Sequence, residues 1–363
     1  MAQSPESEYS LVPSFEVRLD GRPLDGSVLG DIVRVAVSDD IDGLDGFLLE
    51  LRNWDQDSRA FTYSEKDAWL PGHRIEVAMG FLGHEPLTPM IDGVITTLAP
   101  VFRAEDAPTL VVAGQGQLGT LMKAPVTQVY TKATDSQIAK TVAGRLGLQI
   151  RTATGSEEPV QDSVIQANLS DSAFLRERAR RRGYMLLREP MGGGSFRLYF
   201  GPPPAPSPAY TFTWGRNLHR FEPVLDTADQ VAEVTVRAWD PVKKQTLTAT
   251  AARSAAGFSG SLASLDGKLA RAMTGRKEVV VNRVGDDQAQ ITALAKGIMT
   301  DIAFGTLTAE GAGVGLPDMR AGATVSIAGI GKTYSGRWSV TATTHTIGRD
   351  GYQMTFRCRR DSV

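Results

Sequence analysis

The chain has 363 residues, a formal net charge of −2, and 42% hydrophobic and 22% charged residues, which is the ordinary balance of a folded soluble protein. This length leaves room for two or more domains, and the near-neutral charge gives no general attraction to nucleic acid or to an anionic membrane. The single cysteine, Cys358, excludes an internal disulfide and a cysteine-based zinc site, and the four histidines are not paired at short spacing.

The N-terminal stretch is polar and acidic and lacks the apolar core of a secretory signal. No run of about 18 apolar residues is present to span a bilayer. We therefore expect a protein that is made in a cytoplasm without a signal peptide or a transmembrane segment. Residues 1–13 are expected to form a flexible N-terminal lead.

Short alternating apolar runs begin soon after this lead. They are Phe15–Leu19, Val33–Val37, Phe47–Leu51, Ile75–Met79, Met90–Leu98 and Thr109–Ala113. Alternation with period two is typical of strands that bury one face, and Asp-Gly pairs at 20–21, 42–43 and 45–46 favour hairpin turns. We predict that residues 14–115 form a first antiparallel, tube-like β-barrel domain.

The apolar periodicity becomes helical after Thr134, and we predict a small α+β domain over residues 116–201. Thr134 and Gln137 have the spacing of a capping box. A second helix is expected to begin near Ser170 and to end at Gly183, where glycine suits a helix C-terminus. Two strands are expected to follow, Tyr184–Arg188 and Ser195–Phe200.

The last third begins with the clearest punctuation in the chain, a run of prolines. Residues 202–222 are predicted to be a Pro-rich connector and a return strand to the first barrel. Residues 223–363 are predicted to form a second tube-like barrel with one added helix at 286–304, capped by Asp286 and Asp287. The Gly/Ser/Ala-rich stretch at 252–264 is expected to be an exposed loop.

Two stretches about 250 residues apart follow the same pattern. The first comprises Pro71–Gly80, Met90–Leu98 and Thr109–Gly114, and the second comprises Ala321–Gly329, Tyr334–Ala342 and Tyr352–Arg357. In each stretch a glycine opens an alternating strand, a second glycine begins another strand, and a third strand closes the unit. This pattern predicts two similar barrels in one subunit, although generic hairpins can resemble one another by chance.

A G-x-G-x-x-G sequence runs from Gly114 to Gly119 directly after a predicted strand. In a dinucleotide-binding fold such glycines admit a pyrophosphate to a helix N-terminus. Here the upstream strands alternate like an antiparallel sheet, and Pro125 interrupts any helix after Gly119. We interpret the glycines as a turn that leaves the first barrel.

Four aspartates, Asp39, Asp40, Asp42 and Asp45, cluster in one short segment. Paired carboxylates can bind a cation or act in glycoside hydrolysis, but the spacing of an EF-hand is missing. Asp before Gly between two strands is ordinary hairpin chemistry, so we favour a turn.

The remaining candidates are a basic cluster and the cysteine. The arginine-rich run Arg176–Arg182 could bind phosphate, but its positions suit the outer, solvated or subunit-facing surface of a helix. Cys358 lies inside a predicted strand without the partners of a nucleophile. We therefore predict no catalytic, cofactor-binding or metal-binding residues, no cofactor, and no enzymatic activity.

Four blocks of the sequence resemble the phage late control gene D family, in the family's order. The blocks are Pro71–Val77, Ser170–Tyr184, Val234–Pro241 and Leu316–Ile347, which together span nearly the whole chain from about residue 12. Those proteins are baseplate hubs of contractile tails and are similar to the N-terminal hub of type VI secretion VgrG spike proteins. The resemblance implies a mainly β protein with an α+β insertion, assembled as a ring-shaped homotrimer.

In this family the ring joins a hexameric tail tube to a threefold central spike. The resemblance therefore implies four kinds of partner besides the chain itself: the central spike protein, the tail tube protein, baseplate wedge proteins, and a tape-measure or cargo protein in the channel. It implies incorporation into a phage tail or injection particle, without membrane insertion or sequence-specific nucleic-acid binding. Spike-fused relatives continue beyond the hub, whereas this chain stops at Val363, so we expect the spike tip and any lysozyme on separate polypeptides.

Two other classes of function remain open at this point. One is a cell-wall hydrolase of the same apparatus that would use the Asp39–Asp45 cluster. The other is a carbohydrate- or receptor-binding β-module, although aromatic residues make up only 7% of the chain.

Overall fold

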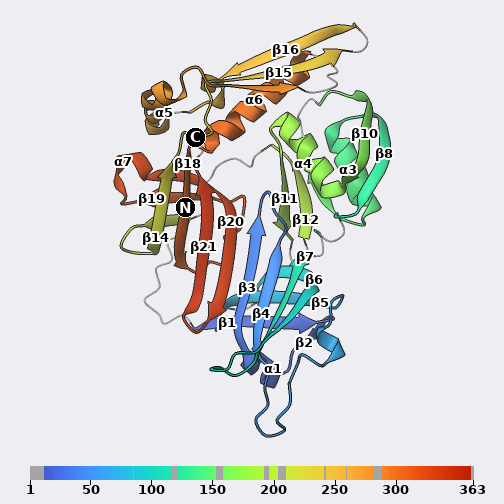
Figure 1. The fold of residues 1–363 in the computed structure, drawn as a ribbon, viewed down its shortest axis with the longest axis vertical. Helices are drawn as coiled ribbons and strands as arrows, with labels where there is room; N and C mark the ends of the chain where they lie inside the picture. Colours follow the sequence, from blue (N-terminus) through green and yellow to red (C-terminus); the bar gives the residue numbers. More distant parts are fainter. Residues whose placement is uncertain are drawn as a thin grey trace.

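The computed structural model describes residues 12–84, 86–116, 119, 122–152, 158–191, 196–202, 210–240, 243–258, 260–281 and 288–360. Most of the ordered elements are strands, and Figure 1 shows a long sheet that runs through the lower and left parts of the molecule. A middle α+β part and a separate small sheet with two helices lie beside and above it. Four apolar cores hold the molecule together: two in the long sheet, one in the middle part and one in the small upper sheet.

The first half of the long sheet is built from the N-terminal residues. Its strands are β1 (Pro13–Leu19), β2 (Arg22–Pro23), β3 (Ile32–Asp40), β4 (Gly46–Arg52), β5 (Arg74–Phe81), β6 (Thr88–Val101) and β7 (Thr109–Gly116), with the short helices α1 (Gly26–Asp31) and η1 (Asp67–Trp69) between them. Alternate residues of these strands are buried, as in β4, where Phe47, Leu49 and Leu51 face the core. The predicted alternation is confirmed.

The second half of the long sheet comes from the C-terminal third. It contains β13 (Tyr210–Thr213), β14 (Leu218–Leu225), β18 (Leu307–Val314), β19 (Thr324–Ala328), β20 (Gly336–Gly348) and β21 (Gly351–Arg359), with the one-turn helix α7 (Gly331–Tyr334). Trp338 is fully buried in the core of this half, where its ring contacts Phe221, and Phe221 in turn contacts Phe356. The first core also takes Ile347 and Tyr352 from this half, so the two cores meet.

The two halves have the same strand order. In the first half the strands lie in the order β1-β5-β6-β7-β4-β3, and in the second in the order β13-β19-β20-β21-β18-β14. The two-residue strand β2 pairs only with β1 at the end of the sheet, and when the six other strands of each half are numbered along the chain, both orders are 1-4-5-6-3-2. One direction differs, because β13 runs parallel to β19 whereas β1 runs antiparallel to β5. The predicted repeat is therefore a repeat of topology, and we call its two copies module 1 and module 2.

The repeated glycines occupy equivalent places in the two modules. Gly72 and Gly322 both have positive φ, +107° and +90°, which glycine adopts without steric strain. The N–H of Gly72 donates to the carbonyl of Ile95 at 2.9 Å, and the N–H of Gly322 donates to the carbonyl of Val340 at 2.8 Å. A β-bulge follows at once in both strands, after Ile95 and after Val340.

The expectation of two closed barrels is wrong. Among the described strands the order is an open path from β14 to β2, and neither module closes on itself. The physical reason is that β3, the strand at the end of module 1 in the sheet order, pairs with β20 of module 2 over residues 35–40. This pairing joins the two modules into one 13-stranded sheet.

The predicted return strand to the first barrel is also placed differently. Residues 203–209 of the connector lie outside the described residues, and the two strands that follow belong to module 2. β13 pairs with β19, and β14 pairs with β18. The proposed domain boundaries themselves stay predictions.

The middle part contains β8 (Pro125–Ala133), α3 (Asp135–Arg145), β9 (Ile150–Thr152), β10 (Gln161–Ser170), α4 (Asp171–Arg182), β11 (Met185–Pro190) and β12 (Phe196–Gly201). The predicted capping box is confirmed, because Gln137 N–H donates to Thr134 Oγ1 at 3.2 Å and Thr134 N–H donates to Gln137 Oε1 at 2.8 Å. The Ser170 hydroxyl caps α4 by accepting a hydrogen bond from the N–H of Ala173 at 3.2 Å, and α4 ends at Gly183 with φ +67°.

The upper part is a small sheet that packs on a helix. Its elements are β15 (Glu233–Asp240), β16 (Gln245–Ala252), η3 (Arg253–Ala256), α5 (Gly260–Met273), β17 (Lys277–Val281) and α6 (Gln288–Phe304). The predicted helix at 286–304 corresponds to α6, and Asp286 and Asp287 lie outside the described residues. The predicted loop at 252–264 is wrong, because η3 and the start of α5 fall within it and Leu262 packs into the core of module 2.

Candidate functional site

The turn between β3 and β4 is the point at which three parts of the chain meet. In Figure 1 the upper ends of β3 and β4 lie between β20 on one side and β11 on the other. The turn itself is stabilised by Asp40, whose Oδ1 accepts hydrogen bonds from the N–H groups of Asp42 and Gly43 at 2.8 and 3.2 Å. The predicted use of these aspartates in a hairpin turn is confirmed, because this is an Asx-type turn.

Asp39 connects module 1 to module 2. Its side chain is buried and accepts hydrogen bonds from Arg320 Nε at 2.8 Å, from Ala321 N–H at 3.1 Å, and from the hydroxyl of Thr343. Burial by itself would raise the pKa of Asp39, but the Arg320 charge and these hydrogen bonds outweigh burial and hold the pKa below its usual value. Asp39 is therefore an ionised structural anchor. We call Asp39, Thr343 and Arg320 the polar triad.

The remaining aspartates of the turn bind arginines of other parts. Asp40 pairs with Arg357 of β21 at 2.6 Å, and Asp45 pairs with Arg188 of β11. Asp42 lies 3.4 Å from Arg180 of α4, at the surface. The carboxylates that could have formed a catalytic pair or a cation site are thus each engaged by an arginine.

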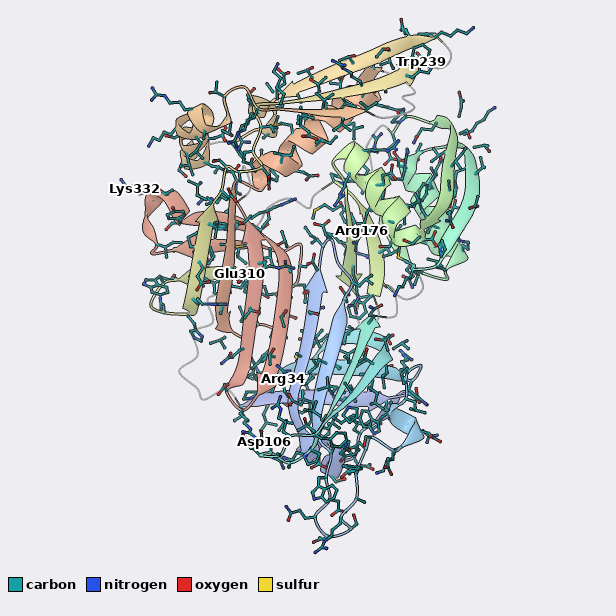
Figure 2. All side chains as sticks on the ribbon, in the orientation of Figure 1. Arg34, Asp106, Arg176, Trp239, Glu310 and Lys332 are labelled. Atoms are coloured by element: carbon teal, nitrogen blue, oxygen red, sulfur yellow. The ribbon has the colours of Figure 1, made fainter. Side chains whose placement is uncertain are left out.

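The arginine-rich run on α4 supplies part of this contact. Arg176 donates to the carbonyl oxygens of Asp42 and Gly43, the latter at 2.5 Å, and Figure 2 labels Arg176 on α4 near the tips of β3 and β4. Arg178 is buried and binds Asp135 at 2.6 Å. The predicted solvated or subunit-facing surface is therefore wrong for these two residues. Opposite charges in the two clusters were the signal in the sequence that could have indicated this contact.

A cavity of about 240 Å³ lies where the turn, α4, β11, β12 and the segment before β19 meet. Its apolar lining comes from all three parts of the chain that meet here, with Leu44 from the turn, Leu187 and Phe196 from the middle part, and Pro317 from module 2. The charged side chains around it include Asp45 and Arg188, which pair with each other. The arrangement is that of an internal interface between parts of the chain.

The buried histidine and cysteine are structural. His345 on β20 accepts a hydrogen bond at Nδ1 from the Tyr352 hydroxyl at 3.1 Å, and its Nε2–H donates to the carbonyl of Met319 at 3.0 Å. Burial and the nearby Arg320 charge lower the pKa of His345 to about 4, so the ring is neutral. Burial raises the pKa of the Cys358 thiol, which disfavours its thiolate form.

The glycine motif at 114–119 has a packing role. Gly114 and Gly116 lie inside β7 rather than in the predicted turn, while residues 117 and 118 are outside the described residues. A Cβ at Gly114 would lie 2.2 Å from the carbonyl oxygen of Val94 and 2.5 Å from the ring of Phe47. Glycine is needed there because the Phe47 ring and the neighbouring strand fill the space.

The face of the long sheet that points away from the cores is polar. It carries Thr308 and Glu310 on β18, Thr355 and Arg357 on β21, and Arg34 on β3, and Figure 2 labels Arg34 and Glu310 on this face. Among the described residues, no cluster of histidine, cysteine or acidic side chains could hold a metal ion. In the same part of the chain, no helix is long and apolar enough to cross a membrane.

Solved structures similar to this chain are phage tail proteins and secretion-system components. The tail protein from Neisseria meningitidis MC58 is 18% identical, with a TM-score of 0.72 over 96% of this chain and 97% of that chain. The 43 kDa tail protein of prophage MuSo2 from Shewanella oneidensis is 15% identical, with a TM-score of 0.72 over 96% and 98% of the two chains. The Escherichia coli c3393 protein, a component of the type VI secretion system, is 11% identical, with a TM-score of 0.54 over 94% and 76%.

These similarities show that the chain has a phage-tail-protein fold. The family model described as the Alg8 N-terminal domain matches residues 10–349, and the chain belongs to this family. The resemblance to the late control gene D family in particular stays a prediction. No curated protein is significantly similar to the chain in sequence.

Proposed function

We propose that this chain is a non-enzymatic structural hub of a contractile phage tail or a phage-derived injection system. The observation that carries the proposal is the repeat of one six-stranded topology, because three copies of a two-module chain supply six similar modules. Such a ring can contact a sixfold tube on one face and a threefold spike on the other. The fold shared with phage tail proteins supports this role.

The polar face of the long sheet suits the wall of an axial channel. Its threonines and its mixed charges, such as Glu310 beside Arg357, offer hydrogen bonds and charges of both signs without a large apolar patch. A tape-measure protein or a cargo protein could pass such a surface without adhering to it. In this role the chain carries out no chemistry, and its paired aspartates serve to hold the modules in place.

The particle mass in solution tests the proposal. Three chains of 39.0 kDa give about 117 kDa. We expect this mass by sedimentation or mass photometry, for the chain alone or with its spike protein, and a ring in electron micrographs of the native particle. A 39.0 kDa species under both conditions would contradict the proposal.

A further inference from the structure

The two modules are joined within the chain by the pairing of β3 of module 1 with β20 of module 2. We call this pairing the internal joint. The second part of β20, after its bulge, pairs antiparallel with β3, so that Ala342 faces Asp40 and Ile347 faces Val35. In module 1 the strand equivalent to β20 is β6, and in module 2 the strand equivalent to β3 is β14. Both of these equivalent edges are without a partner strand among the described residues.

The equivalence holds residue by residue. β3 and β14 each have a bulge near their start, between Ile32 and Arg34 and between Leu218 and Arg220. The pairing of β6 with β7 and of β20 with β21 also matches rung for rung, so Thr97 is equivalent to Ala342. The register of the internal joint can therefore be transferred to the two free edges without adjustment.

We propose that the free edge of β14 pairs with the free edge of β6 in a second copy of the chain, in the register of the internal joint. This proposal rests on the ring described above and specifies how its subunits join. Residues 221–226 of one copy then run antiparallel to residues 97–102 of the next. Leu225 faces Leu98 of the second copy, and Phe221 faces Phe102 of the second copy.

The chemistry of the transferred pairs is complementary. The internal joint contains the polar triad, and the equivalents of Asp39, Thr343 and Arg320 in the free edges are Leu225, Leu98 and Leu70. The equivalence of Leu70 with Arg320 follows from the shared turn, because the N–H groups of His73 and Ala323 both donate to the carbonyl of this residue. We call these three residues the leucine triad. The charged cluster of the internal joint thus corresponds to apolar residues at the two free edges, β14 and β6.

The exposed fractions agree with a surface that a second copy covers. Leu225 is 38% exposed, Leu70 is 45% exposed, Val224 is 54% exposed and Phe102 is 60% exposed. Val224 lies on the polar face of the sheet, beside Thr308, whereas the transferred register brings the other three side chains, from two separate edges, together on the core side. Burial of several large apolar side chains at one place is a usual source of association free energy.

The backbone of this edge also limits which strands can add to it. The N–H of Asp226 donates to Thr306 of the same chain, so the alternate N–H groups, those of Leu225 and Phe221, face the free edge. Pro223 falls between them and meets Pro100 of the second copy in the transferred register. This pair of residues has no N–H donor on either strand, so the contact between copies depends on apolar side chains. An unrelated strand that added to this edge would lose the backbone hydrogen bond at Pro223 without gaining those side-chain contacts.

Disulfide trapping tests the register. Val224 and Ala99 form a pair whose N–H groups point away from each other, a geometry with Cα atoms about 4.5 Å apart, within reach of a disulfide. A mixture of the single variants Val224→Cys and Ala99→Cys should give a crosslinked dimer on a denaturing gel. The native thiol, Cys358, is 2% exposed and stays in place.

Two matched pairs control this experiment. Ser38→Cys with Thr344→Cys in one chain is the internal equivalent and should crosslink without a change in mass. Glu222→Cys mixed with Ala99→Cys is displaced by two residues along the strand and should crosslink about tenfold less, because diagonal neighbours lie about 7–8 Å apart.

Substitution of the leucine triad gives a second, independent readout. Leu225→Asp should shift the mass from the trimer to 39.0 kDa, while Leu82→Asp, at a residue 64% exposed in the turn after β5, should leave the trimer intact. Adding Leu98→Thr and Leu70→Arg to Leu225→Asp rebuilds the polar triad and should recover part of the trimer, because the new carboxylate gains its partners while the lost apolar burial is not replaced. Circular dichroism of each variant confirms that the chain remains folded.

The outcomes separate this inference from the proposed function. A trimer in which the 224–99 pair does not crosslink, or which survives Leu225→Asp, would overturn the joint and leave the hub in place. A chain that stays monomeric alone and with its spike protein would overturn both.

Discussion

Replacement of Asp39 by alanine should destabilise the protein far more than replacement of Asp42, although Asp39, near the end of β3, is only three residues from Asp42 in the turn that follows. Asp39→Ala leaves the guanidinium of Arg320, the N–H of Ala321 and the hydroxyl of Thr343 without their acceptor. The side chain of Arg320 is 18% exposed, so little water can replace the carboxylate. Loss of one partner of a buried ion pair costs about 3–5 kcal/mol, and we expect the lower end of this range because Arg320 keeps some solvent contact.

Asp42→Ala is the matched control. Its ion pair with Arg180 is long, at 3.4 Å, and the two side chains are 63% and 65% exposed. Such surface pairs contribute only about 0–1 kcal/mol, and the carbonyl of residue 42 still accepts from Arg176 after the substitution. The two variants therefore each remove one ion pair from the same short segment, and they differ in whether that ion pair is buried or exposed.

Urea unfolding followed by tryptophan fluorescence measures the difference, since Trp338 is fully buried in module 2, which the polar triad ties to module 1. We expect Asp39→Ala to lower the free energy of unfolding by about 3 kcal/mol and Asp39→Asn to lower it less, because the amide keeps one acceptor. Equal effects of Asp39→Ala and Asp42→Ala would refute the argument that the polar triad holds the modules together.

Three further predictions concern single buried sites. The pKa of His345 is lowered to about 4 in the folded chain, against about 6.5 in the unfolded chain, so the unfolded state binds more protons between pH 4 and pH 6.5. The free energy of unfolding is therefore highest above pH 6.5 and falls by up to about 3 kcal/mol as the pH is lowered toward 4. His345→Gln should flatten this part of the pH profile of unfolding. Gly322→Ala should lower the free energy of unfolding by about 1–2 kcal/mol, and with it the thermal midpoint, because φ is +90° and the new Cβ would lie 3.2 Å from Leu187. Gly144→Ala, in α3 with open space around it, should raise the thermal midpoint. Cys358, with a raised pKa and 2% exposure, should react with a thiol reagent only after unfolding, and fast labelling of the native chain would contradict its place in the core.

The sequence predicted those features that depend on neighbours along the chain. The period-two alternation of β4 and the capping box of Thr134 and Gln137 are local patterns, and the structure confirms both. The repeated glycines were recognisable for the same reason, because a positive φ at Gly72 and Gly322 restricts the residue type at one position. Local geometry is therefore readable from a single sequence.

The partners of strands and charges were not readable in this way. The sequence predicts a strand after the proline run, but nothing in the residues of β14 indicates that it pairs with β18 rather than with module 1. The contact between the Asp39–Asp45 turn and Arg176 joins residues 133 or more positions apart, and only the complementary charge of the two clusters pointed to it. Pairing over such distances depends on the whole fold, since each closure must be favourable together with the others.

The polar triad and the leucine triad differ because one joint is tethered and the other is not. Within the chain, β3 and β20 meet at the high effective concentration that a linked chain provides, so the internal joint can use a buried ion pair, which adds little net stability but fixes the partners of each strand. Between chains, association has to overcome the loss of translational and rotational freedom, and a buried ion pair offers little surplus for that. Apolar burial contributes about 25 cal/mol for each Å² removed from water, which explains why leucines stand at the free edges and charged residues at the internal one.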